Sequence, residues 1–226
     1  MSSQSEVRDR HVAGFGLIET LRWQPGAGFV RLERHLARLA TSAAALGFAW
    51  SEASGMEKLR QAVETAQGDG EIGPLRIRLE LAADGGMEVA ALALAPLPTG
   101  TEWQLRIAST RLDSENALLR HKVTARGAYD AARAEFARHD ADEVILLNER
   151  REVCEGTITS IFVDTGDGGP LRTPAIRCGL LPGVLRSELI DQGRAVETVL
   201  MVADLERAKA VLVGNSLRGL IAARLR

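Results

Sequence analysis

Lysine is scarce in this sequence. Only three of the 28 basic residues are lysines, Lys58, Lys122 and Lys209, and the other 25 are arginines. Lysine differs from arginine because its amine can lose a proton near neutral pH and attack a carbonyl carbon. Each lysine retained in such a chain is therefore a candidate nucleophile as well as a candidate surface charge.

Cysteine is scarcer still, and long apolar runs are missing. Cys154 and Cys178 lie in different segments without CxxC or Cys/His spacing, which argues against a metal site. No apolar run approaches the length of a membrane span, and the polar first ten residues predict no signal peptide. We therefore expect a cytoplasmic protein with two reduced thiols.

Charge of one sign does not accumulate either. The formal net charge is −2, and the arginines are interleaved with aspartate and glutamate, so no nucleic-acid-binding surface is expected. The sequence contains no GxGxxG segment and no P-loop, which are the usual signals of nucleotide binding.

At 226 residues, the chain is long enough for one large domain or two small ones.

The first 95 residues alternate between strand and helix signals. An apolar stripe of period 3.6 that includes Leu36, Leu39 and Leu46 predicts a helix ending at Gly47. Alternation over 75–81 predicts a strand, and Asp84-Gly85-Gly86 predicts a hairpin turn after it. With a strand expected near 14–23 and a second helix over 54–66, stopped by residues 67–70, residues 1–95 are expected to form an α+β domain.

Residues 96–102, which contain two prolines and a glycine within Pro96–Gly100, are expected to be a linker. Residues 103–226 are then expected to form a second, larger domain. Its predicted strands are 103–109, 142–147, 152–157, 171–176, 195–200 and 210–213, and its predicted helices are 126–139, one after Pro182-Gly183, and 203–208.

Four positions could carry chemistry. Lys122 has no acidic neighbour within five residues, whereas Lys58 and Lys209 are expected to face solvent; a plain surface lysine is the alternative at 122. Glu155 lies on a predicted strand just before the small-residue run 156–160, and a solvent-facing hairpin glutamate is its alternative. The helix after Pro182-Gly183 has free first amides that could hold an anion. Arg38 flanks the apolar stripe, where a solvated side chain is the alternative.

Six segments together resemble a known family, the fold-type IV enzymes that use pyridoxal 5′-phosphate (PLP). These are the class IV aminotransferases, which include branched-chain and D-amino-acid aminotransferases and aminodeoxychorismate lyase. The segments span roughly residues 14–220 in the family's order. They are Gly16…Glu19-Thr20-Leu21, His35-Leu36…Arg38-Leu39, Lys122…Arg126, Asp142-Glu143…Glu155…Phe162, Thr173-Pro174…Gly179-Leu180-Leu181-Pro182-Gly183-Val184…Arg186 and Gly214-Asn215-Ser216-Leu217.

The resemblance implies a two-domain α+β fold, with a small N-terminal α/β domain and a larger, mixed β-barrel-like PLP-binding domain. It implies that Lys122 forms the Schiff base and shuttles the Cα proton, and that Glu155 pairs with the pyridine nitrogen. Arg38, the amides of Val184 and Leu185, and the side chain of Asn215 would hold the phosphate. The amide of Ser216 would face the substrate carboxylate, and no metal is implied. By resemblance, then, the catalytic residues are Lys122 and Glu155, which also contact the cofactor together with Arg38, Val184, Leu185 and Asn215.

The same resemblance favours one reaction. Branched-chain aminotransferases usually carry a tyrosine five positions after the lysine, where this chain has Gly127, and a Thr-Ala pair where it has Asn215-Ser216. Arg126 and the Gly-Asn-Ser-Leu segment are closer to aminodeoxychorismate lyase, which eliminates pyruvate to give 4-aminobenzoate. A branched-chain or D-amino-acid aminotransferase using 2-oxoglutarate is the alternative, and a catalytically silent member of the fold is a third. A homodimer acting on a small-molecule substrate is also implied.

Overall fold

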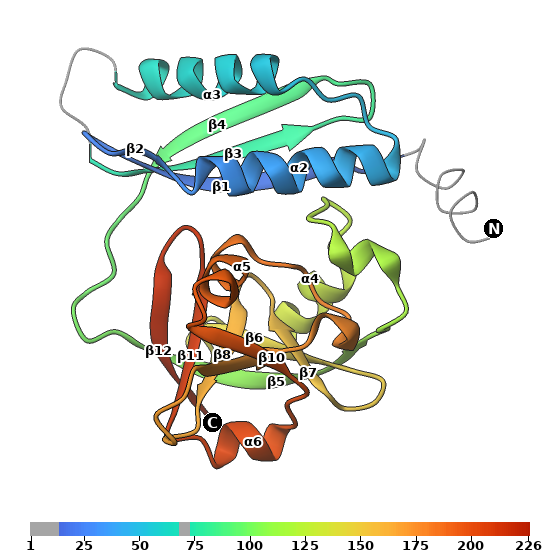
Figure 1. Cartoon of the computed structure of the whole chain (residues 1–226), viewed down its shortest axis with the longest axis vertical. Coiled ribbons are helices and arrows are strands. Elements are labelled where there is room, and N and C mark those ends of the chain that lie inside the picture. Colours follow the sequence, from blue (N-terminus) through green and yellow to red (C-terminus); the bar gives the residue numbers. More distant parts are fainter. Residues whose placement is uncertain (1–13, 68–72) are drawn as a thin grey trace. The chain divides into compact units, whose positions relative to one another are not determined.

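A computed structural model of the chain describes residues 14–67 and 73–226 (Figure 1). The chain forms two compact units: unit 1 comprises Met1–Pro96 and Lys122–Ala125, and unit 2 comprises Leu97–His121 and Arg126–Arg226. The polar first ten residues and residues 68–70 of the predicted helix stop lie outside the described residues. The two-part α+β architecture agrees with the fold class predicted from the sequence.

Unit 1 is a four-stranded antiparallel sheet with two helices. The strands are in the order β2-β1-β3-β4, with α2 packed on β1 and α3 on β3 and β4. The sequence explains this arrangement because every second residue of β3 and the predicted apolar stripe of α2 are buried. The elements are β1 (Leu17–Gln24), β2 (Gly28–Val30), α2 (Leu32–Leu46), α3 (Glu52–Gln67), β3 (Leu75–Leu81) and β4 (Met87–Ala93).

The segment that contains Lys122 belongs to unit 1, whereas the sequence-based division placed it in the second domain. The amide of Ile18 donates to the carbonyl of Lys122 at 2.8 Å, and the amide of Thr124 donates to the carbonyl of Gly16 at 2.9 Å. Val123 forms an antiparallel bridge with Leu17. These backbone bonds attach 122–124 to the start of β1, which linear sequence patterns do not reveal.

Unit 2 is a curled, mixed eight-stranded sheet in the order β10-β9-β8-β11-β12-β5-β6-β7 (Figure 1). Three neighbouring pairs are parallel: β9 with β10, β5 with β12, and β5 with β6. Its elements are β5 (Glu102–Leu112), the 3₁₀ turn η1 (Ala117–Arg120), α4 (Gly127–Ala134), β6 (Glu143–Asn148), β7 (Val153–Gly156), β8 (Ser160–Asp164), β9 (Leu171–Pro174), η2 (Ile176–Cys178), α5 (Val184–Asp191), β10 (Ala195–Thr198), α6 (Val202–Glu206), β11 (Ala210–Asn215) and β12 (Gly219–Leu225).

For unit 2, one predicted helix boundary was wrong and two strands were missed. The helix predicted over 126–139 ends at Ala134, because the following residues form turns. Strands β8 and β12 were not predicted. In β12 the buried residues Ile221 and Ala223 alternate with Ala222 and Arg224, and the small size of alanine weakens the period-2 signal.

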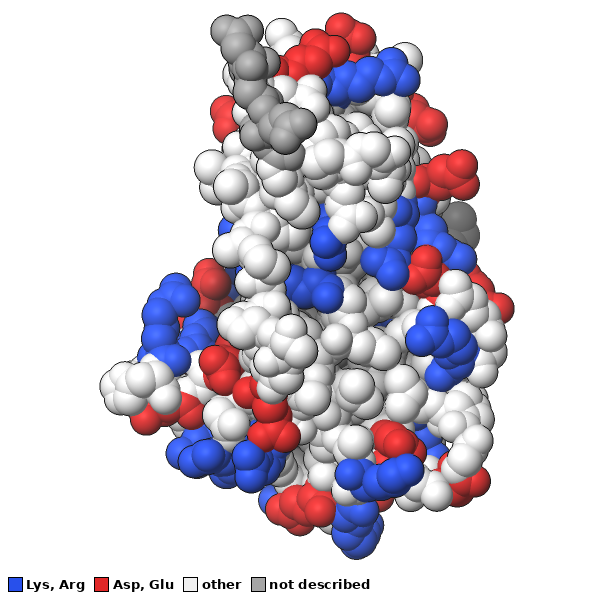
Figure 2. Space-filling model, turned by 90° about the vertical axis from the view of Figure 1, so that its left-hand side faces the viewer, with Lys and Arg blue, Asp and Glu red and all other residues white. Residues whose placement is uncertain are grey.

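The surface carries the mixture of acidic and basic residues that the sequence predicts. Figure 2 shows acidic and basic side chains interspersed on one face of the chain.

Both cysteines are buried free thiols, and burial raises the pKa of Cys178 to about 11. Among the described residues, no helix combines the length and hydropathy required to cross a bilayer.

Candidate functional site

A buried carboxylate organises the predicted site in unit 2. Glu155 lies on β7, where it pairs with Leu146 of β6, and it is 5% exposed. The hydroxyl of Tyr129 donates to its Oε1 at 2.7 Å, and the backbone amide of Leu181 donates to the same oxygen at 3.1 Å. The solvent-facing alternative for Glu155 is therefore wrong, because a buried glutamate is held here by two donors.

Tyr129 keeps its proton at neutral pH. Burial raises the pKa of its hydroxyl, and the charge of Glu155 and their shared hydrogen bond raise it further. Tyr129 lies on α4 with the guanidinium of Arg126 over its ring, 4.7 Å from the ring centre. No role for Tyr129 was predicted from the sequence, although it is the only tyrosine in the chain.

Glu143 fixes the loop that follows Glu155, and sequence reasoning assigned it no role. It is fully buried at the start of β6. Its carboxylate accepts hydrogen bonds from the amides of Val144, Thr157 and Ile158 and from the hydroxyls of Thr157 and Thr159, at 2.6–3.1 Å. The sequence does contain a signal for this role, because a charged residue at the start of a mostly apolar, buried strand needs hydrogen-bond partners.

There is also a steric reason for a glycine in the small-residue run 156–160. A Cβ added to Gly156 would lie 2.4 Å from Oγ1 of Thr159 and 2.8 Å from the carboxyl carbon of Glu143. Glycine is therefore required where the chain approaches this carboxylate. Arg126 also donates to the carbonyl of Thr157, so the loop is held from two directions.

The predicted anion-binding amides lie at the start of α5. Val184 is the first helical residue after Gly183, and the side chains of Val184 and Leu185 are buried. The first amides of a helix have no partner within it, so these two N–H groups are positioned to bind an anion. Arg186 anchors the helix, donating to the carbonyl of Pro174 and to Glu197.

Asn215 and Ser216 form the turn between β11 and β12. The Asn215 side chain accepts from the amides of Leu217 and Arg218 and donates to the carbonyl of Ile158 at 3.3 Å. Asn215 thus ties its turn to the loop after Glu155, and the phosphate contact predicted for its side chain stays a prediction. Ser216 is 7% exposed, and its predicted role toward substrate also stays a prediction.

These unit 2 positions form one cluster. The amide of Leu181 binds Glu155 three residues before α5 begins. A Cβ at Gly214 would lie 2.9 Å from Cδ2 of Leu185, so α5 packs closely on β11 beside Asn215. The structure therefore brings together Glu155, Val184, Leu185 and the Asn215–Ser216 turn.

Unit 1 contains Lys122 and Arg38. Lys122 is half-buried, so it is not a fully exposed surface lysine, whereas Lys58 is exposed as predicted. Arg38 lies on α2, and its Nε and Nη2 donate to Glu19 of β1 at 2.8 and 2.7 Å. The solvated alternative for Arg38 is wrong, since its side chain is 12% exposed. Its phosphate role stays a prediction.

Glu19 carries a charge inside unit 1. Burial alone would raise the pKa of its carboxyl, but the charge of Arg38 and hydrogen bonds from His35 and Arg38 lower it to about 2. Nδ1 of His35 lies 2.6 Å from Oε2 of Glu19. The bidentate Arg38–Glu19 contact therefore fixes the guanidinium in one orientation.

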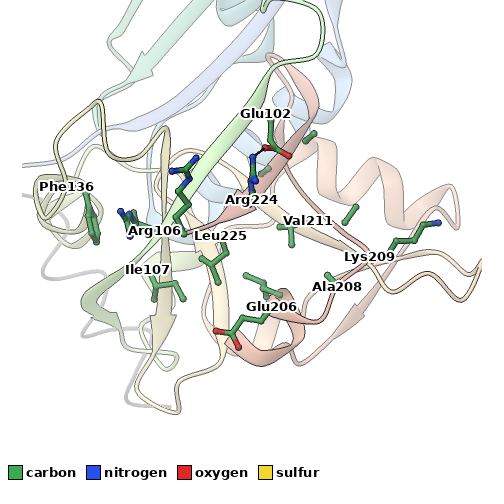
Figure 3. Close-up of a pocket in the computed structure, with 15 residues that line it drawn as sticks. Glu102, Arg106, Ile107, Phe136, Glu206, Ala208, Lys209, Val211, Arg224 and Leu225 are labelled. Carbon is green, nitrogen blue, oxygen red and sulfur yellow. Dashed lines mark hydrogen bonds and ion pairs between the residues drawn. The ribbon is translucent and has the colours of Figure 1, made fainter.

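A cavity of about 850 Å³ lies elsewhere in unit 2. None of the predicted site residues lines it (Figure 3).

The chain resembles known proteins in both sequence and structure. Residues 16–225 match the family profile described as "Amino-transferase class IV". A Mesorhizobium loti structure described as a "Putative amino-acid aminotransferase" is 52% identical, with TM-score 0.87, covering 94% of this chain and 100% of that one. A 4-amino-4-deoxychorismate lyase structure from Pseudomonas aeruginosa is 25% identical, with TM-score 0.72, covering 93% and 82%. A Schizosaccharomyces pombe protein named "Putative aminodeoxychorismate lyase" is 28% identical over 83% of this chain and 80% of its own length.

Proposed function

Because this chain belongs to the class IV aminotransferase family, whose members depend on PLP, we propose that it is an aminodeoxychorismate lyase. The reaction releases pyruvate from aminodeoxychorismate and leaves 4-aminobenzoate. The family and its cofactor are established by the match over residues 16–225, and the choice of reaction is our inference.

The choice of the lyase over an aminotransferase rests on the position of the single tyrosine. The chain has a single tyrosine, and its hydroxyl is bound to Glu155. The position five residues after Lys122 is Gly127, so the tyrosine typical of branched-chain aminotransferases at that point is missing. Two named aminodeoxychorismate lyases among the similar proteins support the same choice.

The residues present fit PLP. A protonated pyridine nitrogen pairs with a carboxylate, and Glu155 is a buried carboxylate held in place by Tyr129 and Leu181. A phosphate is bound by helix N-terminal amides, and Val184 and Leu185 supply two at the start of α5. When bound, PLP withdraws electrons from the carbon that carries the substrate amino group.

The remaining steps are carried out by side chains of this chain. Lys122 would hold the cofactor aldehyde, and once the substrate amino group has displaced it there, the released amine of Lys122 would accept the proton from the amino-bearing carbon. Glu155 would keep the proton on the ring nitrogen, and Tyr129 holds Glu155 in one orientation for this contact. Arg38, held by Glu19, supplies a charge-assisted contact to the phosphate.

An amino-acid aminotransferase is the second candidate, favoured by the name of the 52% identical Mesorhizobium loti protein. The two functions share Lys122 and Glu155 and differ in the step after proton removal. PLP-loaded protein should be supplied with aminodeoxychorismate in one assay and with branched-chain or D-amino acids plus 2-oxoglutarate in another. Formation of 4-aminobenzoate and pyruvate supports the lyase, whereas glutamate formation without 4-aminobenzoate identifies an aminotransferase. Formation of neither product would support a catalytically silent protein.

We also propose a homodimer, on the resemblance of the chain to its family. Light scattering of the purified protein tests this directly. A mass of twice 24.3 kDa supports the dimer, and a mass of 24.3 kDa contradicts it.

A further inference from the structure

The 850 Å³ cavity of unit 2 lies where β12 stops covering β5. The two strands are paired from Ala222–Glu102 to Leu225–Leu105, and beyond that register Arg106 and Ile107 face the cavity. Helix α6 contributes Leu205, and the residues before β11 contribute Lys209. The volume is within the range of roughly 300–1,000 Å³ typical of small-molecule sites.

The cavity is separate from the cluster around Glu155. It is lined by Val211 near the start of β11, whereas Asn215 ends the same strand. Four residues of extended strand place these positions about 13 Å apart. A ligand in the cavity would therefore occupy a second site within unit 2.

One cation in the cavity wall has no partner among the described residues. Arg224 pairs with Glu102 at 2.6 Å, Lys209 with Asp164 at 3.8 Å, and Arg226 donates to Gln104. The guanidinium of Arg106 makes no hydrogen bond or ion pair within residues 14–67 and 73–226, and its Nε is buried. The terminal nitrogens Nη1 and Nη2 are not among the buried atoms without a partner, so they are accessible to an acceptor on a ligand.

The rest of the lining narrows the ligand class. Figure 3 shows Arg106, Ile107 and Phe136 on one side of the cavity and Val211, Ala208 and Lys209 on the other. Apolar side chains face a body without charge, and since Arg224 is already paired with Glu102, Arg106 is the cation available to an acceptor on the ligand. A planar carboxylate can accept two parallel hydrogen bonds from a single guanidinium group.

We propose that this cavity binds a small monocarboxylate with an apolar body. Its carboxylate pairs with the guanidinium of Arg106, and its body packs on Ile107, Leu205 and Leu225. The site is independent of the reaction proposed above, since neither Lys122 nor Glu155 lines it.

The probe is 2-naphthoate, titrated by its own fluorescence into PLP-loaded protein, with the uncharged 2-naphthamide as the matched ligand. Saturable binding of 2-naphthoate is expected, weakened about tenfold or more in Arg106→Gln, because a charge-assisted hydrogen bond is lost. Arg106→Lys should fall between the two, since an ammonium keeps the charge and loses the fork. Binding of 2-naphthamide should be weak and equal in wild type and Arg106→Gln.

Arg172→Gln is the control, because Arg172 is exposed, pairs with Asp167 and does not line the cavity. It should bind 2-naphthoate as the wild type does. The melting temperature of Arg106→Gln should equal or exceed that of the wild type, because a buried unpaired group is removed. Equal affinity in wild type and Arg106→Gln, equal binding of the amide and the carboxylate, or no saturable binding by wild type would each overturn the proposal. The titration records no turnover, so its result is separate from that of the lyase assay.

Discussion

The Tyr129 hydroxyl donates to Oε1 of Glu155 across 26 residues of sequence, at 2.7 Å. This bond joins α4 to β7 and leaves Glu155 a buried acceptor. Because the pKa of Tyr129 is raised by burial and by Glu155, the direction of donation does not change near neutral pH. The bond therefore makes Tyr129 a positioning residue for the carboxylate proposed to hold the cofactor ring.

Replacement of Tyr129 by phenylalanine should impair catalysis more than folding. The substitution keeps the ring under Arg126 and removes a donor to Oε1, while the amide of Leu181 still donates to it. We expect kcat/KM to fall about tenfold, mostly in kcat, since one hydrogen bond to a charged group is lost. Thr65→Val, which removes an exposed hydroxyl bond on α3, is the control. Unchanged kcat/KM in Tyr129→Phe would show that Glu155 does not depend on this hydroxyl.

Replacement of Arg38 should weaken binding of the phosphate and spare binding of the ring. In Arg38→Gln we expect the Kd for PLP to rise about tenfold or more, while the Kd for pyridoxal, which has no phosphate, changes little. Absorbance titrations of both compounds measure this. Arg60→Gln, on the exposed side of α3, should bind both compounds as the wild type does. An equal loss of affinity for PLP and pyridoxal would assign Arg38 a structural role only.

The charge on Glu19 should make stability fall in acid. Its folded pKa of about 2 is below its ordinary value of 4.5, so its contribution is complete above pH 4.5 and is lost as the pH falls toward 2. Thermal melts at pH 6, 4 and 3 should show a smaller acid-induced decrease in Glu19→Gln than in wild type. Glu80→Gln, which breaks the more exposed Arg78 pair, should retain the wild-type decrease. Parallel decreases in wild type and Glu19→Gln would contradict the assignment.

Glu143 should be required for the fold of the loop after Glu155. In Glu143→Gln, one carboxylate oxygen becomes an NH₂ group facing donors, so some of the five hydrogen bonds are lost. We expect a loss of roughly 3 kcal/mol in unfolding free energy, measured by urea denaturation. The neighbouring Asp142→Asn variant should lose less, because that carboxylate accepts one exposed bond from Gln104. An equal loss of unfolding free energy in both variants would show that the five hydrogen bonds to Glu143 do not stabilise the fold more than one exposed bond does.

Local patterns predicted much of the fold. The alternation of 75–81 and the stripe of α2 each specify one buried face, so β3 and α2 appear where the sequence places them. Strand β12 was missed because its alternation is weak, although it forms a local hairpin with β11; its other partner, β5, lies more than a hundred residues earlier. The attachment of 122–124 to β1 is likewise a long-range backbone pairing with no local signal.

The candidate site was predicted only in part, for similar reasons. Motif order along the chain selected Glu155 and the start of α5, which the structure places in one cluster. Tyr129 and Glu143 act through side-chain contacts that depend on the folded sheet, so their partners could not be identified from spacing. Asn215 shows the reverse case, because its side-chain atoms hold its own turn and the carbonyl of Ile158.

Lys122 is, in our proposal, the residue that holds the cofactor. Borohydride reduction of PLP-loaded protein, followed by peptide mapping, tests this most directly, because the other two lysines serve as internal controls. We predict a pyridoxyl group on Lys122 alone, and no modification in Lys122→Ala. Modification of Lys58 or Lys209 instead, or no fixed cofactor in the wild type, would contradict the assignment.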